Sequence, residues 1–188
     1  MVLAYFGYFC LILLTIIACA NVVLPIAFRF AKGLPLLTSV SARFTGFVDI
    51  FGVQMKMQVV KLALSSICVA LLVFSYAISD FSLKLVMLTS DASMPLQYKL
   101  SCIWSSHEGS ILFWVFIMQF MGFFIGRKPH LFGSFSPEAS SFALYFYNII
   151  TVAFLLFILS FANPFLINQF NAESGMGMNI ILQDGFMM

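Results

Sequence analysis

Four long apolar runs, separated by stretches that carry most of the charges, constrain the fold of this chain more than any other feature. The runs cover residues 2–28, 62–79, 109–126 and 139–161. A helix needs about 20 mainly apolar residues to cross the hydrocarbon core of a bilayer. Only 9% of the 188 residues are charged, whereas soluble domains average about 25%. We therefore predict an all-α membrane protein with about four transmembrane helices, which form a single transmembrane domain over residues 1–188.

The basic residues are concentrated in the first and third of the stretches between the runs. These two stretches hold most of the nine Lys and Arg residues, namely Arg29, Lys32, Arg43, Lys56, Lys61, Arg127 and Lys128. Basic stretches stay on the cytoplasmic or matrix side of a membrane. With an even number of spans, both termini are then expected on the outer side. No basic cluster lies on a polar face, so lipid rather than nucleic acid is the expected surrounding.

Two of the connecting stretches are expected to have structure of their own. In the first, Phe44, Phe47 and Phe51 recur at helical spacing, which predicts an amphipathic helix in the membrane interface. A face that binds a partner is the alternative. In the second, Phe, Leu and Met residues occupy every other position over residues 81–87, which predicts an extended stretch in the outer loop.

Two prolines are expected to mark helix ends. Pro95 suits the first turn of a helix, because its missing N–H is not needed there. Pro164 follows the fourth apolar run and cannot continue the helical hydrogen bonding. The neighbouring Asn163 side chain can bond nearby backbone groups and also favours a helix end.

Residues able to carry chemistry gather where the outer loop meets the third run. A His with a neighbouring carboxylate, as in His107 and Glu108, can ligate a metal or haem iron, or shuttle a proton. The alternative is a helix start, at which Glu108 and Ser110 cap the helix and offset its dipole while His107 sits in the interface. Trp104 and Trp114 flank this position, either as interfacial anchors or as a stacking surface for a flat macrocycle.

Several other kinds of site are not expected. The four cysteines include no Cys-x-x-Cys pair, so neither a zinc site nor a disulfide framework is predicted. The sequence contains no Gly-rich phosphate loop and no convincing Ser-His-Asp arrangement. No run has a charged residue at its centre, which makes a transporter or channel a weaker hypothesis.

The order of short motifs in the outer loop and beyond resembles a known family. Residues 79–81 read SDF, residues 95–99 read PLQYK and residues 104–114 read WSSHEGSILFW. This order resembles the CcmF family of haem lyases, whose members carry Asp-Phe, then Leu-Pro-x-x-Tyr, then Trp-Gly-x-His-Glu-Gly-Ser-Leu-Leu-Leu-Trp. Residues 154–165 match the next family signature, and residues 179–184 are similar to its Asn-Pro-Leu-Leu-Gln-Asp segment.

The resemblance implies a role in system I cytochrome c maturation, which joins haem vinyl groups to the two thiols of an apocytochrome Cys-x-x-Cys-His motif on the outer side. The chain would be the N-terminal subunit of a cytochrome c haem lyase, helping to position haem and apocytochrome for thioether attachment but not catalytic alone. The implied cofactor is haem b at an interface with a partner chain. The residues that would contact it are Trp104, His107, Glu108, Trp114, Gln183 and Asp184.

The implied partners are the remaining CcmF fragment or fragments, other cytochrome c maturation proteins, and apocytochrome c. Split forms of this family occur in mitochondrial genomes, so the mitochondrial inner membrane is the expected location and a bacterial plasma membrane the alternative. The alternative function is a non-catalytic structural subunit of an inner-membrane respiratory assembly.

Overall fold

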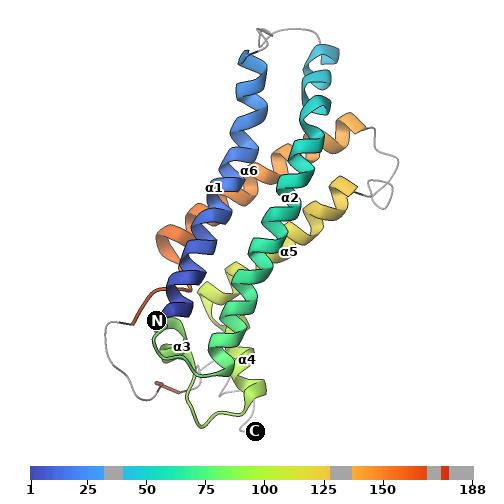
Figure 1. The fold of residues 1–188 in the computed structure, drawn as a ribbon. Helices are drawn as coiled ribbons and strands as arrows, with labels where there is room; N and C mark the ends of the chain where they lie inside the picture. The colour runs from blue at the N-terminus through green and yellow to red at the C-terminus, as the bar shows by residue number, and fades with distance from the viewer. Residues whose placement is uncertain (32–39, 128–136, 169–174, 178–188) are drawn as a thin grey trace.

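The computed structural model describes residues 1–31, 40–127, 137–168 and 175–177 (Figure 1). Most of the described residues lie in helices. Within the described ranges no strand forms, apart from one isolated bridge. Four helices are long and apolar enough to cross a membrane. The expected fold class, an all-α membrane protein with four transmembrane helices, is therefore confirmed.

Four long helices and two short ones make up the described structure. The candidate spans lie in α1 (Val2–Ala31), α2 (Val40–Ala77), α5 (His107–Arg127) and α6 (Pro137–Phe161). The short helices α3 (Lys84–Thr89) and α4 (Leu96–Ser105) lie near the amino terminus at one end of the bundle, which we name the outer end (Figure 1). The opposite end, where α1 ends and α2 begins, is the inner end.

The second helix is much longer than its membrane span. The apolar window of α2 is Gln54–Ala77, but the helix has 38 residues and is therefore about 57 Å long at roughly 1.5 Å per residue. The hydrocarbon core is only about 30 Å thick. Residues 40–53, expected as a separate amphipathic helix, are the inner part of α2. Their side chains lie outside the described structure, so the amphipathic face stays a prediction.

Lys61 lies inside the span of α2, whereas the sequence placed it in the stretch before that span. It is fully buried. Counted from Gln54, it is about 10 Å inside the inner edge of the apolar window. The sequence analysis took each charged residue as the end of an apolar run. It could not show that another helix supplies a polar partner to a lysine within the membrane.

The outer end is closed by hydrogen bonds between segments far apart in the sequence. The terminal amine of Met1 donates to the hydroxyl of Ser82 at 2.8 Å. The N–H of Lys84 donates to the carbonyl of Leu166 at 2.9 Å, and the N–H of Asn168 donates to the carbonyl of Ser82 at 2.8 Å. The start of α1, the loop after α2 and the segment after α6 are therefore joined at this end.

The outer loop is less extended than the alternation of its residues predicts. Only Leu83 forms a bridge, with Ile167, and α3 begins at the next residue. The prediction of an extended stretch over residues 81–87 is therefore wrong except at Leu83, because residues 81–82 form a turn and the helix follows Leu83. The reason is burial, because the short helix buries three consecutive side chains, Leu85, Val86 and Met87.

Both helix ends marked by proline are confirmed. Helix α4 begins at Leu96, directly after Pro95, and α6 ends at Phe161, just before Pro164. The side-chain oxygen of Asn163 accepts a hydrogen bond from the N–H of Phe165 at 3.0 Å. This bond offers the backbone an alternative to the helix, as expected for Asn at such a position.

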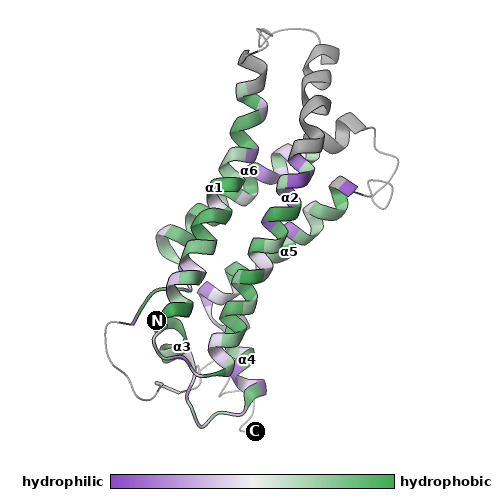
Figure 2. Ribbon diagram, in the orientation of Figure 1, coloured by the Kyte–Doolittle hydropathy of each residue, from purple (hydrophilic) through white to green (hydrophobic). Residues whose placement is uncertain are grey.

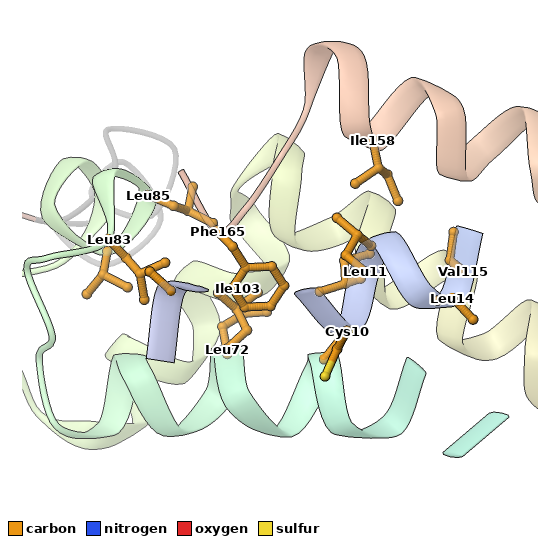
Figure 3. Close-up of a cluster of buried hydrophobic side chains, with 14 of the residues drawn as sticks. Cys10, Leu11, Leu14, Leu72, Leu83, Leu85, Ile103, Val115, Ile158 and Phe165 are labelled. Atoms are coloured by element: carbon orange, nitrogen blue, oxygen red, sulfur yellow. The ribbon is translucent and has the colours of Figure 1, made fainter. Parts of the chain in front are cut away.

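The apolar core lies in the outer half of the bundle, where the four long helices meet α3 and α4 (Figure 3). It is built from buried aliphatic side chains of all four spans, including Leu11, Leu14, Leu72, Val115 and Ile158. The faces turned away from this core are also apolar, with exposed side chains such as Phe9, Ile16 and Phe74, and Figure 2 shows mainly hydrophobic residues along α1 and the outer part of α2. Such exposed apolar surface suits contact with lipid.

The ring of Phe165 seals the core against α1. It is almost fully buried and packs on Gly7, where a Cβ atom would lie only 2.4 Å from two ring carbons. Gly7 is therefore needed for close approach of the segment after α6.

We expect Gly7→Ala to lower the free energy of unfolding by about 1–3 kcal/mol, because the added methyl group overpacks this contact. Thermal unfolding in detergent measures the effect. In a Phe165→Ala background the ring is gone, so the same substitution should cost much less. Equal costs in the two backgrounds would contradict the proposed contact.

Candidate functional site

The His-Glu-Gly-Ser segment forms a tight corner between α4 and α5. Ser106, just before α5, caps that helix, because its hydroxyl oxygen accepts a hydrogen bond from the N–H of Gly109 at 3.3 Å. The same hydroxyl donates to the carbonyl of Ile103 at 3.0 Å. A cap of this kind satisfies one of the N–H groups that a helix start leaves without a partner.

The cap differs in part from the one expected. Glu108 lies in the first turn of α5, where a negative charge offsets the helix dipole. Ser110, however, is not a cap, because its hydroxyl donates to the carbonyl of His107 at 3.1 Å. The sequence alone did not distinguish it from Ser106, since several serines surround this helix start.

Gly109 is required by the close approach of the two helices at this corner. A Cβ atom at Gly109 would lie 2.4 Å from the carbonyl oxygen of Ile103 and 2.5 Å from the hydroxyl of Ser106. The first of these is a backbone atom and cannot move without displacing α4. The glycine therefore lets α4 turn directly into α5 and fixes the direction in which the neighbouring His107 projects.

Buried polar contacts hold the corner to α2 and α3. The hydroxyl groups of Tyr76 and Thr89 lie 2.7 Å apart and share a hydrogen bond. The thiol of Cys102 donates to the carbonyl of Thr89 at 3.0 Å. Cys102 is fully buried, so its thiol is part of this support.

The loop between α3 and α4 is fixed by a buried lysine. The ammonium of Lys99 donates to the hydroxyl of Ser79 at 2.7 Å and to the carbonyl of Ala92 at 3.0 Å. At the surface of the same loop, the pKa of Asp91 is lowered, because its carboxylate accepts hydrogen bonds from the hydroxyl of Ser93 and the N–H of Ala92. The loop therefore holds α4 in a defined position.

His107 and Trp114 lie on one face of α5 at its outer end. Both are exposed, and a separation of seven residues places them on the same helical face, about 10 Å apart along the axis. The His107 ring meets the ring of Phe157 on α6 edge-on, with centroids 6.3 Å apart. We name the surface formed by His107, Trp114 and Phe157 the outer aromatic face.

Trp104 points to a different side of the corner. Its ring packs edge-on against Phe113 at a centroid distance of 5.5 Å. It also lines an apolar pocket of about 240 Å³, together with Val69, Val73, Leu100, Ile103 and Phe113. The structure therefore brings His107 and Trp114 to one surface and Trp104 to another, with Glu108 half-buried at the corner.

The remaining predicted site residues, Gln183 and Asp184, lie outside the described residues. Within the described part of the chain, no three His, Cys, Asp or Glu side chains come together in a way that could hold a metal ion. For the described site residues, the arrangement offers one exposed imidazole beside aromatic rings.

A group of buried polar residues within the membrane was not anticipated from the sequence. Seven side chains from all four long helices form what we name the polar layer: Asn21, Gln54, Gln58, Lys61, Gln119, Asn148 and Thr151. Their signal in the sequence was the spacing of Gln54, Gln58 and Lys61, which repeats at one helical face. It was missed because these residues were assigned to a loop.

Comparison with known proteins places the chain among cytochrome c biogenesis proteins. It is 33% identical to the cytochrome c-type biogenesis protein ccl1 of Rhodobacter capsulatus over 95% of this chain and 25% of that protein. It is 37% identical to CcmF of Haemophilus influenzae over 53% of this chain and 15% of that protein. It is 34% identical to CycK of Rhizobium meliloti over 74% of this chain and 20% of that protein.

These relatives confirm the resemblance found in the sequence, and the chain is homologous to CcmF-type cytochrome c biogenesis proteins. The chain spans about a quarter or less of the length of the curated relatives that it matches. No family model matches the chain, and no solved structure matches it.

We expect Gly109→Ala to distort the corner and lower stability by about 1–3 kcal/mol, because the added methyl group meets the Ile103 carbonyl. Ser110→Ala is the matched control, since Ser110 caps nothing, and should change stability by less than about 0.5 kcal/mol. Thermal unfolding of both variants in detergent gives the comparison. If Gly109→Ala proved as mild as Ser110→Ala, the close approach described here would be incorrect.

Proposed function

We propose that this chain, a homologue of CcmF-type cytochrome c biogenesis proteins, forms the N-terminal part of a cytochrome c haem lyase. In this role it would help to position haem and apocytochrome for thioether attachment. It would not be catalytic alone, because the chain spans only about a quarter of its relatives. The segments that correspond to the rest of those relatives complete the enzyme, on the same polypeptide or on a separate one.

The observation that carries this proposal is the outer aromatic face. The close approach of α4 and α5 at Gly109 leaves His107 at the surface, and its ring contacts the ring of Phe157 edge-on. Trp114 extends the same face along α5, with about half of its side chain exposed. An imidazole and an indole on one exposed face suit contact with a flat, largely apolar ligand that also offers a metal ion.

Haem suits the chemistry of this face. His107 would supply an imidazole nitrogen to its iron and Trp114 a stacking or edge contact, and among the described residues no group of three or more His, Cys, Asp or Glu side chains could hold a metal ion. When bound, haem would supply the vinyl groups to which the apocytochrome thiols are joined. Glu108, half-buried beside His107, can accept a hydrogen bond or a proton near this surface.

Trp104 is proposed to act apart from this face. Its apolar pocket suits an apolar side chain of a partner, so we assign Trp104 to partner contact as well as to the haem region. Gln183 and Asp184 remain proposed contacts to haem or apocytochrome.

The charge distribution supports an outward position for the outer aromatic face. In the sequence, most basic residues fall in the stretches between the first and second and between the third and fourth apolar runs, and such basic stretches stay on the cytoplasmic or matrix side. The outer end would then face the periplasm or the intermembrane space, where apocytochrome c and other maturation proteins would be met. We propose the mitochondrial inner membrane as the location, with a bacterial plasma membrane as the alternative.

A gentle-detergent pull-down tests the assembly. We expect the chain to recover the remaining parts of a CcmF-type protein, with the absorbance of haem in the eluate. Recovery of respiratory-complex subunits alone, without haem and without those parts, would instead favour a structural subunit of a respiratory assembly.

Substitutions on the outer aromatic face test the role of its residues. We expect His107→Ala to lower the haem recovered with the assembly at least about tenfold if an axial or hydrogen-bonding contact of more than 1.4 kcal/mol is lost. Trp114→Ala should lower it less. Phe120→Ala removes an exposed aromatic ring on the same helix nearer the inner end and should have no effect. Equal haem recovery from all three variants would contradict the assignment.

A further inference from the structure

The polar layer lies inside the membrane, in the inner half of the bundle. Each of its seven side chains is buried, and hydrophilic residues are visible where α2 and α6 cross in Figure 2. Gln119 and Asn148 lie about 8–9 Å inside the inner edges of their apolar windows. Polar and charged groups at such depth are costly and commonly mark a functional site.

Hydrogen bonds join three of the four long helices at this level. The amide nitrogen of Gln58 donates to both the backbone carbonyl and the side-chain oxygen of Gln119, each at 3.1 Å. The amide nitrogen of Gln119 lies 3.4 Å from the hydroxyl of Thr151, to which it donates. Lys61 donates to the side-chain oxygen of Asn148. These bonds link α2 with α5 and α6.

Within the described structure, the layer also holds amide nitrogens and amide oxygens without a partner, the side-chain oxygen of Gln58 among them. Both polar side-chain atoms of Asn21 and both of Gln54 are buried without a hydrogen-bond partner. Lys61 has three N–H groups, and a single bond to Asn148 is described for it. Within the membrane no solvent can satisfy such groups unless it enters the bundle.

Lys61 has no acidic partner inside the described spans. The four apolar windows contain one acidic residue, Glu108, which lies at the outer end of α5. Lys61 lies toward the inner end of α2. The side chain shown in contact with Lys61 is the neutral Asn148 of α6, and Gln58 and Gln119 of the same layer, which bond to each other, are also neutral. The layer therefore holds one lysine without an acidic partner and the unbonded side-chain amides of Asn21 and Gln54.

Helix α1 contributes Asn21 to the layer and forms one of its walls. Cys10 of α1 and Cys68 of α2 belong to the same buried cluster, and the two helices run antiparallel (Figure 1). Moving the same number of residues inward from each cysteine brings Asn21 level with the segment between Gln54 and Gln58. Within the described residues, no side-chain hydrogen bond joins α1 to the layer. Pro25 lies within α1 and has no N–H for the carbonyl of Asn21, so the helix is weakened at this level.

We propose that the polar layer is a binding site for a small monovalent anion, which enters from the inner end when α1 bends at Pro25. The layer is closed in this packing, because its side chains are buried. Bending of α1 would expose Lys61 and the amide nitrogens of Gln54 and Asn21 to the incoming anion. A monovalent anion balances the single charge of Lys61, whereas a divalent one would leave a net negative charge in the membrane.

Thiol modification tests access to the layer. In a cysteine-free variant that still folds, Asn21→Cys places a thiol in the layer, and Val23→Cys places one on the exposed, lipid-facing side of the same helix. The probes are the anionic sulfonatoethyl and the cationic trimethylammonium-ethyl methanethiosulfonates. We expect the anionic reagent to modify Asn21→Cys at least about tenfold faster than the cationic one, since a lone cation in a low-dielectric cleft concentrates anions. Val23→Cys should react slowly with both.

Variants of Lys61 and Pro25 test the mechanism. Lys61→Gln should abolish the preference for the anionic reagent, whereas Lys61→Arg should retain it. When chloride replaces bulky gluconate at constant ionic strength, it should slow modification of Asn21→Cys if Lys61 is present. It should not do so if Lys61→Gln is added.

Pro25→Ala should slow modification of Asn21→Cys severalfold, because it restores the helical hydrogen bond. An unreactive Asn21→Cys, or equal rates with the two reagents, would overturn the proposal. Monodisperse elution from a size-exclusion column is the control that each variant is folded.

Discussion

The structure depends on one constraint, which is that a bilayer core offers no water to buried polar groups. The four long helices satisfy their backbone groups internally, and their apolar outer faces contact lipid without further partners. The constraint then acts most strongly on the few polar side chains that remain. At the outer end they are paired, as in the contacts of Tyr76 with Thr89 and of Lys99 with Ser79. In the polar layer they are paired only in part, and that is where an additional ligand has a physical reason to bind.

The outer end shows how a short sequence segment fixes the position of an exposed imidazole. Gly109 lets α4 approach α5 closely, Ser106 caps the new helix, and His107 is left at the surface with one aromatic neighbour. None of these residues would be informative in isolation. Together they explain why a glycine and a serine accompany the His-Glu pair, since both serve the corner on which the imidazole is mounted.

Much of the fold could be predicted from the sequence because hydropathy and helix-breaking residues act locally. The number of spans, the start of α4 after Pro95 and the end of α6 before Pro164 follow from such signals. The course of residues 84–89 did not, because burial of three side chains outweighed their alternating pattern. Lys61 was assigned to a loop because its partners, Asn148 above all, lie far away in the sequence. For the candidate site, the positions of His107 and Glu108 at a helix start were predictable, but the turning of Trp104 to another side depends on packing against Phe113.

The central claim is that this chain serves cytochrome c maturation, as its homologues and its outer aromatic face suggest. The most direct measurement is haem staining of denatured cytochrome c from cells in which the chain is depleted and then restored. The account predicts that covalently bound haem disappears on depletion while apocytochrome remains, and that restoring the chain returns it. Unchanged covalent haem in depleted cells, with a defect confined to the assembly of a respiratory complex, would contradict the account.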